Sequence, residues 1–281
     1  MAAVVMNGKA LAAKVKQEVK ERVSQMEQKP GLAVVLVGDN PASHVYANGK
    51  RRDCEECGIY SEEYMVPETI SQDEFVSLLE ELNQREDIDG ILIQLPLSEH
   101  LDEKQILLTI RPDKDVDCFH PYNMGRLTEG EEGVYPCTPA GVMRILKEYN
   151  IDPSGKYCVV IGRSNIVGKP QALMMMQANA TVTVCHTKTP DLKADCLRAD
   201  IIISAAGKPN LVTADMVKEG AVVIDVATTR TEQGGLCGDV DYEAVAQKAS
   251  YITPVPGGVG PVTRAMLMEN TLYAARLHGK K

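Results

Sequence analysis

The stretch Tyr157–Pro170, YCVVIGRSNIVGKP, decides the fold of this 281-residue chain. Its apolar run CVVI is followed at once by Gly162, and Gly168 stands a few residues further on. This order predicts a buried strand that stops in a tight turn and opens a helix. Such a turn points backbone N–H groups and the positive end of a helix at one place, which suits a phosphate. The spacing differs from the usual G-x-G-x-x-G dinucleotide pattern, because Ser164 stands where the second glycine is expected.

The next β-branched run, Thr181–Cys185, is followed by polar residues with no acid until Asp191. In a dinucleotide domain, an Asp or Glu at this place binds the ribose hydroxyls of NAD, whereas basic and hydroxyl groups accommodate the 2′-phosphate of NADP. We therefore predict an NADP site; the alternative is an ordinary α/β turn with polar surface residues. The residues that we place near the extra phosphate are Arg163, Ser164, His186 and Thr187.

Length and charge limit the classes of protein that this chain fits. Its 281 residues allow one large or two ordinary domains, and 44% hydrophobic with 25% charged residues is typical of a globular protein. The net charge of −9 argues against a general nucleic-acid or anionic-membrane surface. The first residues lack a signal-peptide pattern, and no apolar run approaches the ~18–20 residues that span a bilayer. We expect neither nucleic acid nor a membrane as a partner.

The eight cysteines are scattered rather than arranged as a disulfide framework. Cys54 and Cys57 have the spacing of a metal-binding pair, but no second pair or histidine cluster follows at a zinc-site distance. Cys158 and Cys185 lie in predicted buried strands. We therefore expect reduced thiols, a cytoplasmic protein and no bound metal.

Strands and helices are expected to alternate, which predicts right-handed βαβ units and a mainly parallel sheet. The segment Asp113–Pro139 is expected to be mostly irregular, and so long an irregular segment is more often functional than idle. The expected strands are Leu32–Val37, Ile59–Val66, Ile91–Leu97, Cys158–Ile161, Thr181–Cys185, Asp200–Ser204, Ala221–Val226 and Ser250–Thr253. The expected helices are Gly8–Met26, Ser43–Cys57, Ser71–Asn83, Asp102–Ile110, Pro139–Tyr149, Ala214–Lys218 and Val262–Leu277.

Tyr46 and Lys50 stand four residues apart, so they share one face of a predicted helix. That helix follows the carboxyl end of a strand, the edge at which open α/β sheets bind ligands. An amine beside an aromatic hydroxyl in a partly dry cleft has its charged form disfavoured and can transfer protons. Lys50 also heads the charged run KRRD, and spacing alone favours a solvated helix face.

Gln94 interrupts an otherwise apolar strand. A buried carboxamide without partners costs about 1–3 kcal/mol, so either a ligand or the backbone must satisfy it. Asp115 and Asp117 flank Val116 in the irregular segment. A carboxylate there suits the N–H edge of a heterocycle; the alternative is turn formation by an Asx side chain.

Seven motifs in a fixed order resemble one family over nearly the whole chain, the bifunctional methylenetetrahydrofolate dehydrogenase/methenyltetrahydrofolate cyclohydrolases. The motifs are Tyr46-x-x-x-Lys50, Ile93-Gln94-Leu95-Pro96-Leu97, Pro112-x-Lys114-Asp115-Val116-Asp117, Pro136-Cys137-Thr138-Pro139, Gly162-Arg163-Ser164-x-Ile166-Val167-Gly168-x-Pro170, Cys185-His186-Thr187-Lys188-Thr189 and Ile252-Thr253-Pro254-Val255-Pro256-Gly257-Gly258-Val259-Gly260-Pro261.

The resemblance implies two steps at one folate site. Hydride passes from 5,10-methylenetetrahydrofolate to NADP, and water then opens the methenyl cation to 10-formyltetrahydrofolate. A dehydrogenase with weak or no cyclohydrolase activity is the nearest alternative. An unrelated two-domain NADP oxidoreductase, or a binding protein that has lost turnover, would have less reason to carry all seven motifs.

The resemblance also implies roles for individual residues. Lys50 would transfer protons and position charge in the hydrolysis, Gln94 would position Lys50 or the substrate, and Asp117 would hold the pterin edge. Tyr46 would stack on the folate. The implied substrate-binding residues are Tyr46, Lys50, Gln94, Leu95, Asp117, Pro256, Gly257 and Gly258. The implied cofactor-binding residues are Gly162, Arg163, Ser164, Ile166, Val167, Gly168, His186, Thr187, Ala206, Thr228 and Thr229.

The fold that the resemblance implies has two α/β domains with the active-site cleft between them. The catalytic folate-binding domain would comprise residues 1–138 plus 262–281, and the second, Rossmann-like NADP-binding domain residues 139–261. The family implies a homodimer and a role in one-carbon metabolism that serves purine biosynthesis.

Several positions depart from the family pattern. The family typically has Gly where this chain has Cys118, in the loop that presents Asp117. Many relatives read Gly-Ile-Asn where this chain has residues 227–229, Ala-Thr-Thr, near the expected nicotinamide position. Thr187 stands for the usual Ser and keeps its hydroxyl. The change at 227–229 bears on cofactor geometry and rate more than on cofactor identity.

Overall fold

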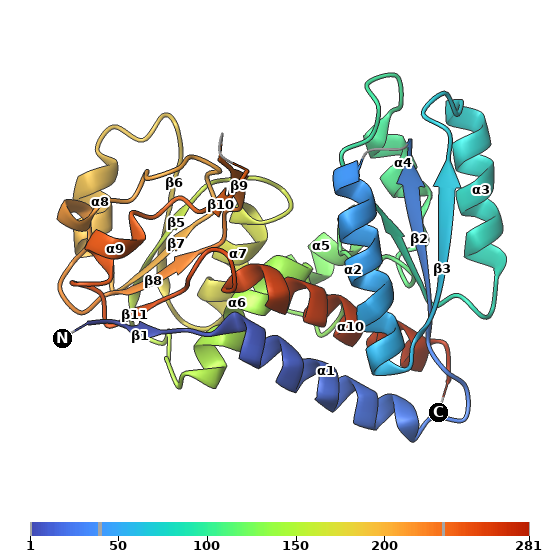
Figure 1. Ribbon diagram of the computed structural model, residues 1–281, viewed down its shortest axis with the longest axis horizontal. Coiled ribbons are helices and arrows are strands. Elements are labelled where there is room, and N and C mark those ends of the chain that lie inside the picture. Colours follow the sequence, from blue (N-terminus) through green and yellow to red (C-terminus); the bar gives the residue numbers. More distant parts are fainter. Residues whose placement is uncertain (1, 39–40, 232–233, 281) are drawn as a thin grey trace. The chain divides into compact units, whose positions relative to one another are not determined.

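The chain folds into two compact α/β units (Figure 1). The computed structural model describes residues 2–38, 41–231 and 234–280, without the side chains of residues 41–47. One unit comprises residues 1–13 and 138–263; the other comprises residues 14–137 and 264–281. We call them the six-stranded unit and the three-stranded unit after their parallel sheets, which confirm the predicted fold class.

The six-stranded unit has the strand order β1-β11-β8-β7-β5-β6, with every neighbouring pair parallel. Its central strands are continuous apolar runs because helices and loops bury both sheet faces. A short antiparallel pair, β9 and β10, lies apart from the sheet. The strands are β1 (Val4–Val5), β5 (Tyr157–Ile161), β6 (Thr181–Cys185), β7 (Ile201–Ser204), β8 (Val222–Asp225), β9 (Thr229–Arg230), β10 (Leu236–Cys237) and β11 (Tyr251–Ile252).

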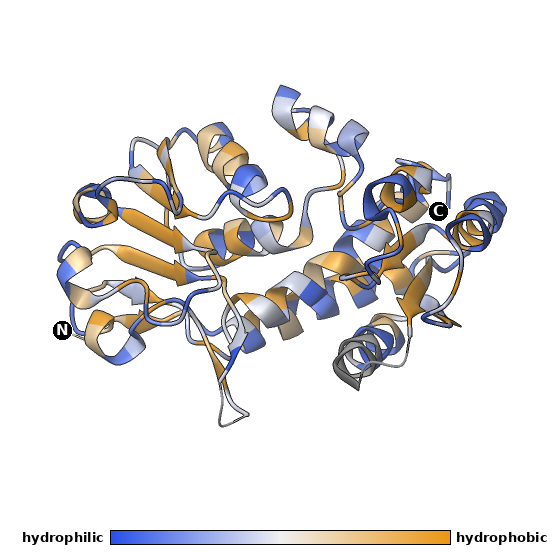
Figure 2. Cartoon of the chain, turned by 90° about the horizontal axis from the view of Figure 1, so that it is seen from above, coloured by the Kyte–Doolittle hydropathy of each residue, from blue (hydrophilic) through white to orange (hydrophobic). Residues whose placement is uncertain are grey.

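Helices follow the strands of this unit and enclose one hydrophobic core, in which Val159, Ile202 and Val223 are fully buried. Figure 2 shows the strands of both sheets as mostly hydrophobic and the helices as mixed. The helices are α6 (Cys137–Glu148), α7 (Gly168–Gln177), α8 (Leu192–Arg198), the 3₁₀ turn η1 (Ala214–Met216) and α9 (Tyr242–Val245).

The three-stranded unit has the parallel order β3-β2-β4, and β2, GLAVVLV, is its central strand. Cys54 and Leu272 pack on one face of the sheet, whereas Phe75 and Ile106 pack on the other. The elements are β2 (Gly31–Val37), α2 (Pro41–Cys57), β3 (Tyr60–Val66), α3 (Gln72–Gln84), β4 (Gly90–Ile93), α4 (Glu103–Thr109) and α5 (Pro121–Glu129). Helices α1 (Gly8–Ser24) and α10 (Val259–Leu277) contribute residues to both units.

The structure corrects several expected elements. The segment predicted to be irregular contains α5, which starts with Pro121 in its first turn and ends at Gly130 with a φ of 75°. Both residues are ordinary helix boundary signals, because proline suits the first turn and glycine the left-handed cap. Helix α2 likewise begins at a proline, Pro41, rather than at Ser43, because proline suits the first turn of a helix. The helix expected at Ala214–Lys218 is a single 3₁₀ turn.

The capping box predicted at Ser71 is present, and the Ser71 hydroxyl accepts a hydrogen bond from the backbone N–H of Glu74 at 3.3 Å. Strand β4 is shorter than expected and ends at Ile93, which leaves Gln94 just beyond the strand. Helix α10 begins at Val259, earlier than predicted. In the part of the chain that the structure describes, no helix is long and apolar enough to cross a membrane.

Candidate active site

In the three-stranded unit, Lys50 and Gln94 meet at the carboxyl edge of the sheet. The Nζ of Lys50, on α2, donates a hydrogen bond to Oε1 of Gln94 at 3.0 Å. The Nε2 of Gln94 donates to the backbone carbonyl of Leu95 at 3.0 Å, which fixes the orientation of its amide. Lys50 is therefore not part of a freely solvated helix face, although its neighbours Arg51 and Arg52 are exposed.

Asp117 reaches the same cluster through a short extension of the sheet. Asp115 pairs with Ile91 of β4 in a parallel bridge, so the next residues run along the edge of β4. Val116 packs so closely that a Cβ on Gly90 would lie 2.6 Å from its Cγ1. The Nδ2 of Asn270 donates to the Val116 carbonyl at 2.8 Å. The segment that ends in Asp117 is thus anchored from both sides.

Burial and charge perturb the titrating groups of this cluster in opposite directions. Desolvation lowers the pKa of Lys50, and the nearby Asp117 carboxylate partly offsets that shift. Desolvation raises the pKa of Asp117 to about 6, against the opposing effect of Lys50. The thiol of Cys137 lies 3.7 Å from Oδ1 of Asp117, and burial beside this carboxylate holds the pKa of the thiol well above its usual range. A cation and an acid with perturbed pKa values in one cluster are typical of a functional site.

Asp115 and Asp117 have different roles although they are two residues apart. The Asp115 carboxylate accepts hydrogen bonds from the backbone N–H of Phe119 at 3.2 Å and of His120 at 2.8 Å. It also accepts from Nδ2 of Asn123 at 2.9 Å. Asp115 therefore holds the loop 115–120 together through its side chain, and Asp117 alone is left for the site.

Cys118 adopts a φ of 61°, the left-handed region that favours glycine. Its thiol donates to the carbonyl of Val134 at 3.2 Å. Cys118 thus makes a side-chain hydrogen bond in a backbone conformation that glycine would adopt without strain.

Arg264 and Asp53 support the helix segment that carries Lys50. Arg264 Nε donates to Asp53 at 2.6 Å, and Lys16 contacts the same carboxylate at 3.0 Å. A Cβ on Gly49 would lie 2.7 Å from an Arg264 guanidinium nitrogen, so Arg264 packs closely on the helix beside Lys50. Sequence patterns gave no sign of Arg264, because its partner is more than 200 positions away.

The side chain of Tyr46 lies outside the described residues. The other predicted substrate residues, Pro256, Gly257 and Gly258, belong to the six-stranded unit. The backbone N–H of Lys9 donates to the carbonyl of Gly257 at 3.2 Å, and a Cβ on Gly8 would lie 1.7 Å from the Gly258 carbonyl oxygen. The start of α1 thus lies directly against this glycine-rich loop.

In the six-stranded unit, the predicted strand–turn–helix forms between β5 and α7. Gly162 has a φ of 121°, which only glycine adopts readily. A Cβ on Gly168 would lie 2.2 Å from the Gly162 carbonyl oxygen, so the helix start needs glycine to pack on the turn. The Ser164 hydroxyl accepts from the backbone N–H of Val167 at 3.2 Å and of Gly168 at 3.3 Å. Its O–H remains a donor toward solvent, beside the exposed Arg163 and Ile166.

The end of β6 presents a hydrogen-bond donor in place of an acid. The Nδ1 of His186 accepts from the backbone N–H of Lys188 at 3.1 Å, which leaves the proton of the neutral ring on Nε2. Thr187 is exposed beside it. Asp191 is used as the N-cap of α8 and accepts from the backbone N–H of Ala194 at 2.9 Å. This first acid after β6 is thus committed to a helix end.

The carboxyl ends of neighbouring strands come together beside this turn. Gly162 donates its backbone N–H to Cys185 at 2.8 Å, and Ala205 donates to Ile161 at 2.7 Å. Sequence reasoning missed two buried acids at this edge, Asp225 and Asp239; Asp225 follows the apolar run VVI, whereas Asp239 stands between Gly238 and Val240 without such a signal. The other predicted cofactor residues at this edge are Ala206, Thr228 and Thr229.

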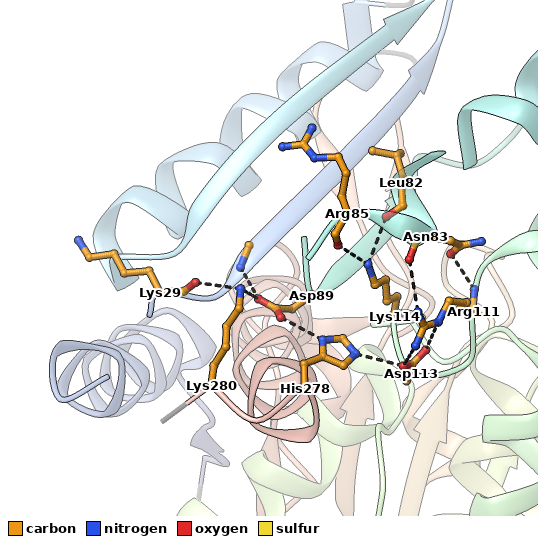
Figure 3. Close-up of polar contacts among 11 residues, drawn as sticks. Lys29, Leu82, Asn83, Arg85, Asp89, Arg111, Asp113, Lys114, His278 and Lys280 are labelled. Atoms are coloured by element: carbon orange, nitrogen blue, oxygen red, sulfur yellow. Dashed lines mark hydrogen bonds and ion pairs between the residues drawn. The ribbon is translucent and has the colours of Figure 1, made fainter. Parts of the chain in front are cut away.

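A second polar cluster, drawn in Figure 3, lies at the amino end of β4, whereas Gln94 follows the carboxyl end of that strand. Asp89, fully buried just before β4, accepts from Lys280 at 2.7 Å and lies 3.0 Å from Nδ1 of His278. The Nζ of Lys114 donates to carbonyls at the end of α3, of Leu82 at 3.2 Å and Arg85 at 2.6 Å. These contacts anchor the C-terminal segment and cap a helix, which is a structural role. Within the described ranges, no group of three or more His, Cys, Asp or Glu residues is arranged to hold a metal ion.

Two family models match the chain, one for each part of the sequence. The model of the tetrahydrofolate dehydrogenase/cyclohydrolase catalytic domain matches residues 6–117, and that of the NAD(P)-binding domain of the same family matches residues 136–279. The chain belongs to the tetrahydrofolate dehydrogenase/cyclohydrolase family. The match covers both segments that carry the predicted site residues.

Relatives in the tetrahydrofolate dehydrogenase/cyclohydrolase family resemble the chain over its whole length. The bifunctional protein FolD of Moorella thermoacetica is 55% identical and covers 98% of this chain and 100% of its own. The crystal structure of the bifunctional FolD of Campylobacter jejuni has a TM-score of 0.97 at 52% identity, covering 98% and 99% of the two chains. The Trypanosoma brucei FolD, crystallised with NADP and an inhibitor, has a TM-score of 0.94 at 38% identity, covering 99% and 98%.

Proposed function

We propose that this family member oxidises 5,10-methylenetetrahydrofolate with NADP and hydrolyses the methenyl product to 10-formyltetrahydrofolate. The observation that carries the proposal is the cluster of Lys50, Gln94 and Asp117 at one sheet edge, with a 3.0 Å contact between the first two. The family match and the bifunctional relatives support both activities.

In this proposal the three-stranded unit holds the reduced folate. The Asp117 carboxylate accepts N–H groups of the pterin edge, and Tyr46 and Leu95 contact the ring. Lys50 is the group that moves a proton during hydrolysis, because burial lowers its pKa and so makes the neutral amine more accessible. Gln94 holds the amine in position through its side-chain oxygen. The glycine-rich loop Pro256–Gly258 contributes substrate contacts.

The six-stranded unit suits the cofactor. When bound, NADP supplies a hydride acceptor, and the protein contributes orientation. The cradle at Gly168 has no room for a Cβ, and the turn leaves hydroxyl, guanidinium and imidazole donors facing outward. The residues that we assign to the cofactor are Gly162, Arg163, Ser164, Ile166, Val167, Gly168, His186, Thr187, Ala206, Thr228 and Thr229.

The test of the folate site is Lys50→Ala, with the neighbouring exposed residue changed in Arg51→Ala as the matched control. We expect cyclohydrolase turnover of Lys50→Ala to fall by about 10²–10⁴-fold while NADP binding persists, because the change removes a proton-transfer group. Arg51→Ala should keep both the cyclohydrolase turnover and the NADP binding of the wild type. Hydrolysis at the wild-type rate in Lys50→Ala would refute the assigned role. NADPH formation by the wild type without 10-formyl product would identify it as a dehydrogenase alone.

The test of NADP preference is Arg163→Ala. Removal of an exposed guanidinium beside the turn should weaken NADP binding and leave NAD binding nearly unchanged, because only NADP carries the 2′-phosphate. Titration of both dinucleotides against wild type and variant measures the ratio of the Kd values for NADP and NAD. An unchanged ratio would remove Arg163 from the site.

We also propose that the protein works as a homodimer in the cytoplasm and that its product serves purine biosynthesis. The family resemblance and the eight free cysteines, seven of them buried, support this setting. Light scattering on the purified protein would give its mass; a monomer at working concentration would contradict the dimer.

A further inference from the structure

Asp239 is fully buried and binds the loop that follows β7. One carboxylate oxygen, Oδ2, accepts from the Ser204 hydroxyl at 2.8 Å and from the backbone N–H of Ala206 at 2.7 Å. The other oxygen, Oδ1, accepts from the backbone N–H of Lys208 at 2.7 Å. A single side chain therefore fixes the start, middle and end of the segment 204–208.

Asp225 in turn fixes the backbone around Asp239. Its Oδ1 accepts from the backbone N–H of Asp239 at 3.1 Å, and its Oδ2 accepts from that of Val240 at 2.9 Å. A Cβ on Gly238 would lie 2.0 Å from Oδ2 of Asp225, so the chain wraps around this carboxylate only because residue 238 is glycine.

Asp225 also reaches two further segments at the carboxyl edge of the sheet. Its Oδ1 accepts from the backbone N–H of Ala227 at 3.2 Å, at the start of the segment that contains Thr228 and Thr229. Its backbone N–H donates to the Thr253 hydroxyl at 2.7 Å, just before the glycine-rich loop. The two carboxylates thus link the segments that follow β7 and β8 to the backbone at residues 239–240, and the backbone of Asp225 ties in Thr253 after β11.

Burial of two carboxylates is costly unless hydrogen bonds compensate each of them. Both acids are buried, and among the described residues the bonds of their carboxylates come from backbone N–H groups and one hydroxyl, with no Lys, Arg or His. Burial, with the Asp239 charge as a smaller contribution, raises the pKa of Asp225 to about 6. Each buried acid must be compensated by its hydrogen bonds. The bonds of Asp239 hold the loop 204–208, which contains Ala206, and those of Asp225 hold Ala227 and the backbone of Asp239 and Val240.

We propose that Asp239 is a positioning residue for NADP: it holds the loop 204–208 in the shape that receives the cofactor, and Asp225 holds Asp239. This inference rests on the proposed NADP site. The acids act through the backbone and need not touch the cofactor, because the loop atoms that they fix, including those of Ala206, form the binding edge.

The test is Asp239→Asn, with Asp241→Asn as the matched control. Asp241 lies two positions away, is not fully buried, and its side chain makes no capping hydrogen bond to α9. In Asp239→Asn one acceptor oxygen becomes an NH₂ group that faces backbone N–H donors, so the loop must shift. We expect the Kd for NADP to rise about tenfold or more, as unmet buried donors require, whereas Asp241→Asn should bind as wild type does.

Two further measurements separate positioning from folding. Cyclohydrolase turnover of 5,10-methenyltetrahydrofolate, assayed without dinucleotide, reports on the intact chain, and we expect the KM for NADP to rise without an equal loss of this turnover. Wild-type NADP affinity in a folded Asp239→Asn protein would overturn the inference, as would an equal loss of NADP affinity and of cyclohydrolase turnover.

If Asp239→Asn fails to fold, Ser204→Ala is the deciding variant. It removes one donor to Asp239, and an unchanged Kd for NADP would also overturn the inference. A wild-type protein that binds no NADP would instead refute the proposed function.

Discussion

The Nζ of Lys50 lies 3.0 Å from Oε1 of Gln94, and the two residues come from different parallel βα units. Lys50 is on the helix that follows β2, and Gln94 follows β4, the strand beside it. Because parallel strands end at the same edge of a sheet, a lysine and a carboxamide that are 44 positions apart become one hydrogen-bonded pair. The hydrogen bond sets the direction of the amine, and burial lowers its pKa.

The first prediction concerns the charge at residue 94. Gln94→Glu places a carboxylate against the amine and should raise the pKa of Lys50, whereas Gln94→Leu removes the acceptor and should lower it further. The limb of the cyclohydrolase pH profile along which Lys50 loses its proton and becomes the reactive neutral amine should therefore move to higher pH in the first variant and to lower pH in the second. A shift in the same direction in both variants would contradict this account. The NADP affinity of both variants serves as the control.

The second prediction concerns the acid limb of the pH profile of kcat/KM for the folate. Asp117 has a pKa of about 6, so its carboxylate is charged above that pH and becomes protonated as the pH falls through it. Only the charged form accepts two N–H groups, so kcat/KM for the folate should fall about tenfold per pH unit below this value. Asp117→Asn should have low kcat/KM without this limb. Retention of the limb in that variant would assign it to another group.

The third prediction concerns the turn after β5. Gly168→Ala forces a Cβ to within 2.2 Å of the Gly162 carbonyl oxygen, so the turn must open and NADP affinity and Tm should both fall. Gly125→Ala, inside α5 with no atom within 4 Å of the added Cβ, is the matched control. It should raise Tm slightly, because alanine is the better helix former. Equal behaviour of the two variants would show that the close approach is unimportant.

The fourth prediction concerns the C-terminal cluster of Figure 3. The side chain of Lys280 is 9% exposed and pairs with the fully buried Asp89, so Lys280→Gln leaves a buried carboxylate short of charge compensation. We expect the free energy of unfolding to fall by about 3 kcal/mol, measured by denaturant titration. Lys193→Gln breaks a pair whose side chains are 52% and 63% exposed and should leave the midpoint unchanged. Similar midpoints for the two variants would argue against the anchoring role of the C-terminal segment.

Local sequence signals predicted the regular elements that have their own boundary residues. The Ser71 capping box, the run CVVI before Gly162 and the alternation of strands with helices all appear as expected. Helix α5 was missed although Pro121 and Gly130 mark its ends, because the surrounding proline and glycine residues indicated an irregular loop. Strand β1 was missed because two residues carry no periodicity, and only pairing with β11 makes them a strand.

The sequence by itself determined the α/β class, the glycine-containing turn after β5 and the identity of Lys50, Gln94 and Asp117 as residues of interest, because periodicity, turn residues and ordered motifs can be read along the chain. Only the tertiary structure decided which partners they meet: that Asp115 holds the loop 115–120 while Asp117 joins Lys50, and that Asp225 and Asp239 link the segments that follow β7 and β8. The physical reason is that burial and hydrogen bonding depend on contacts between distant segments, which a local pattern does not specify.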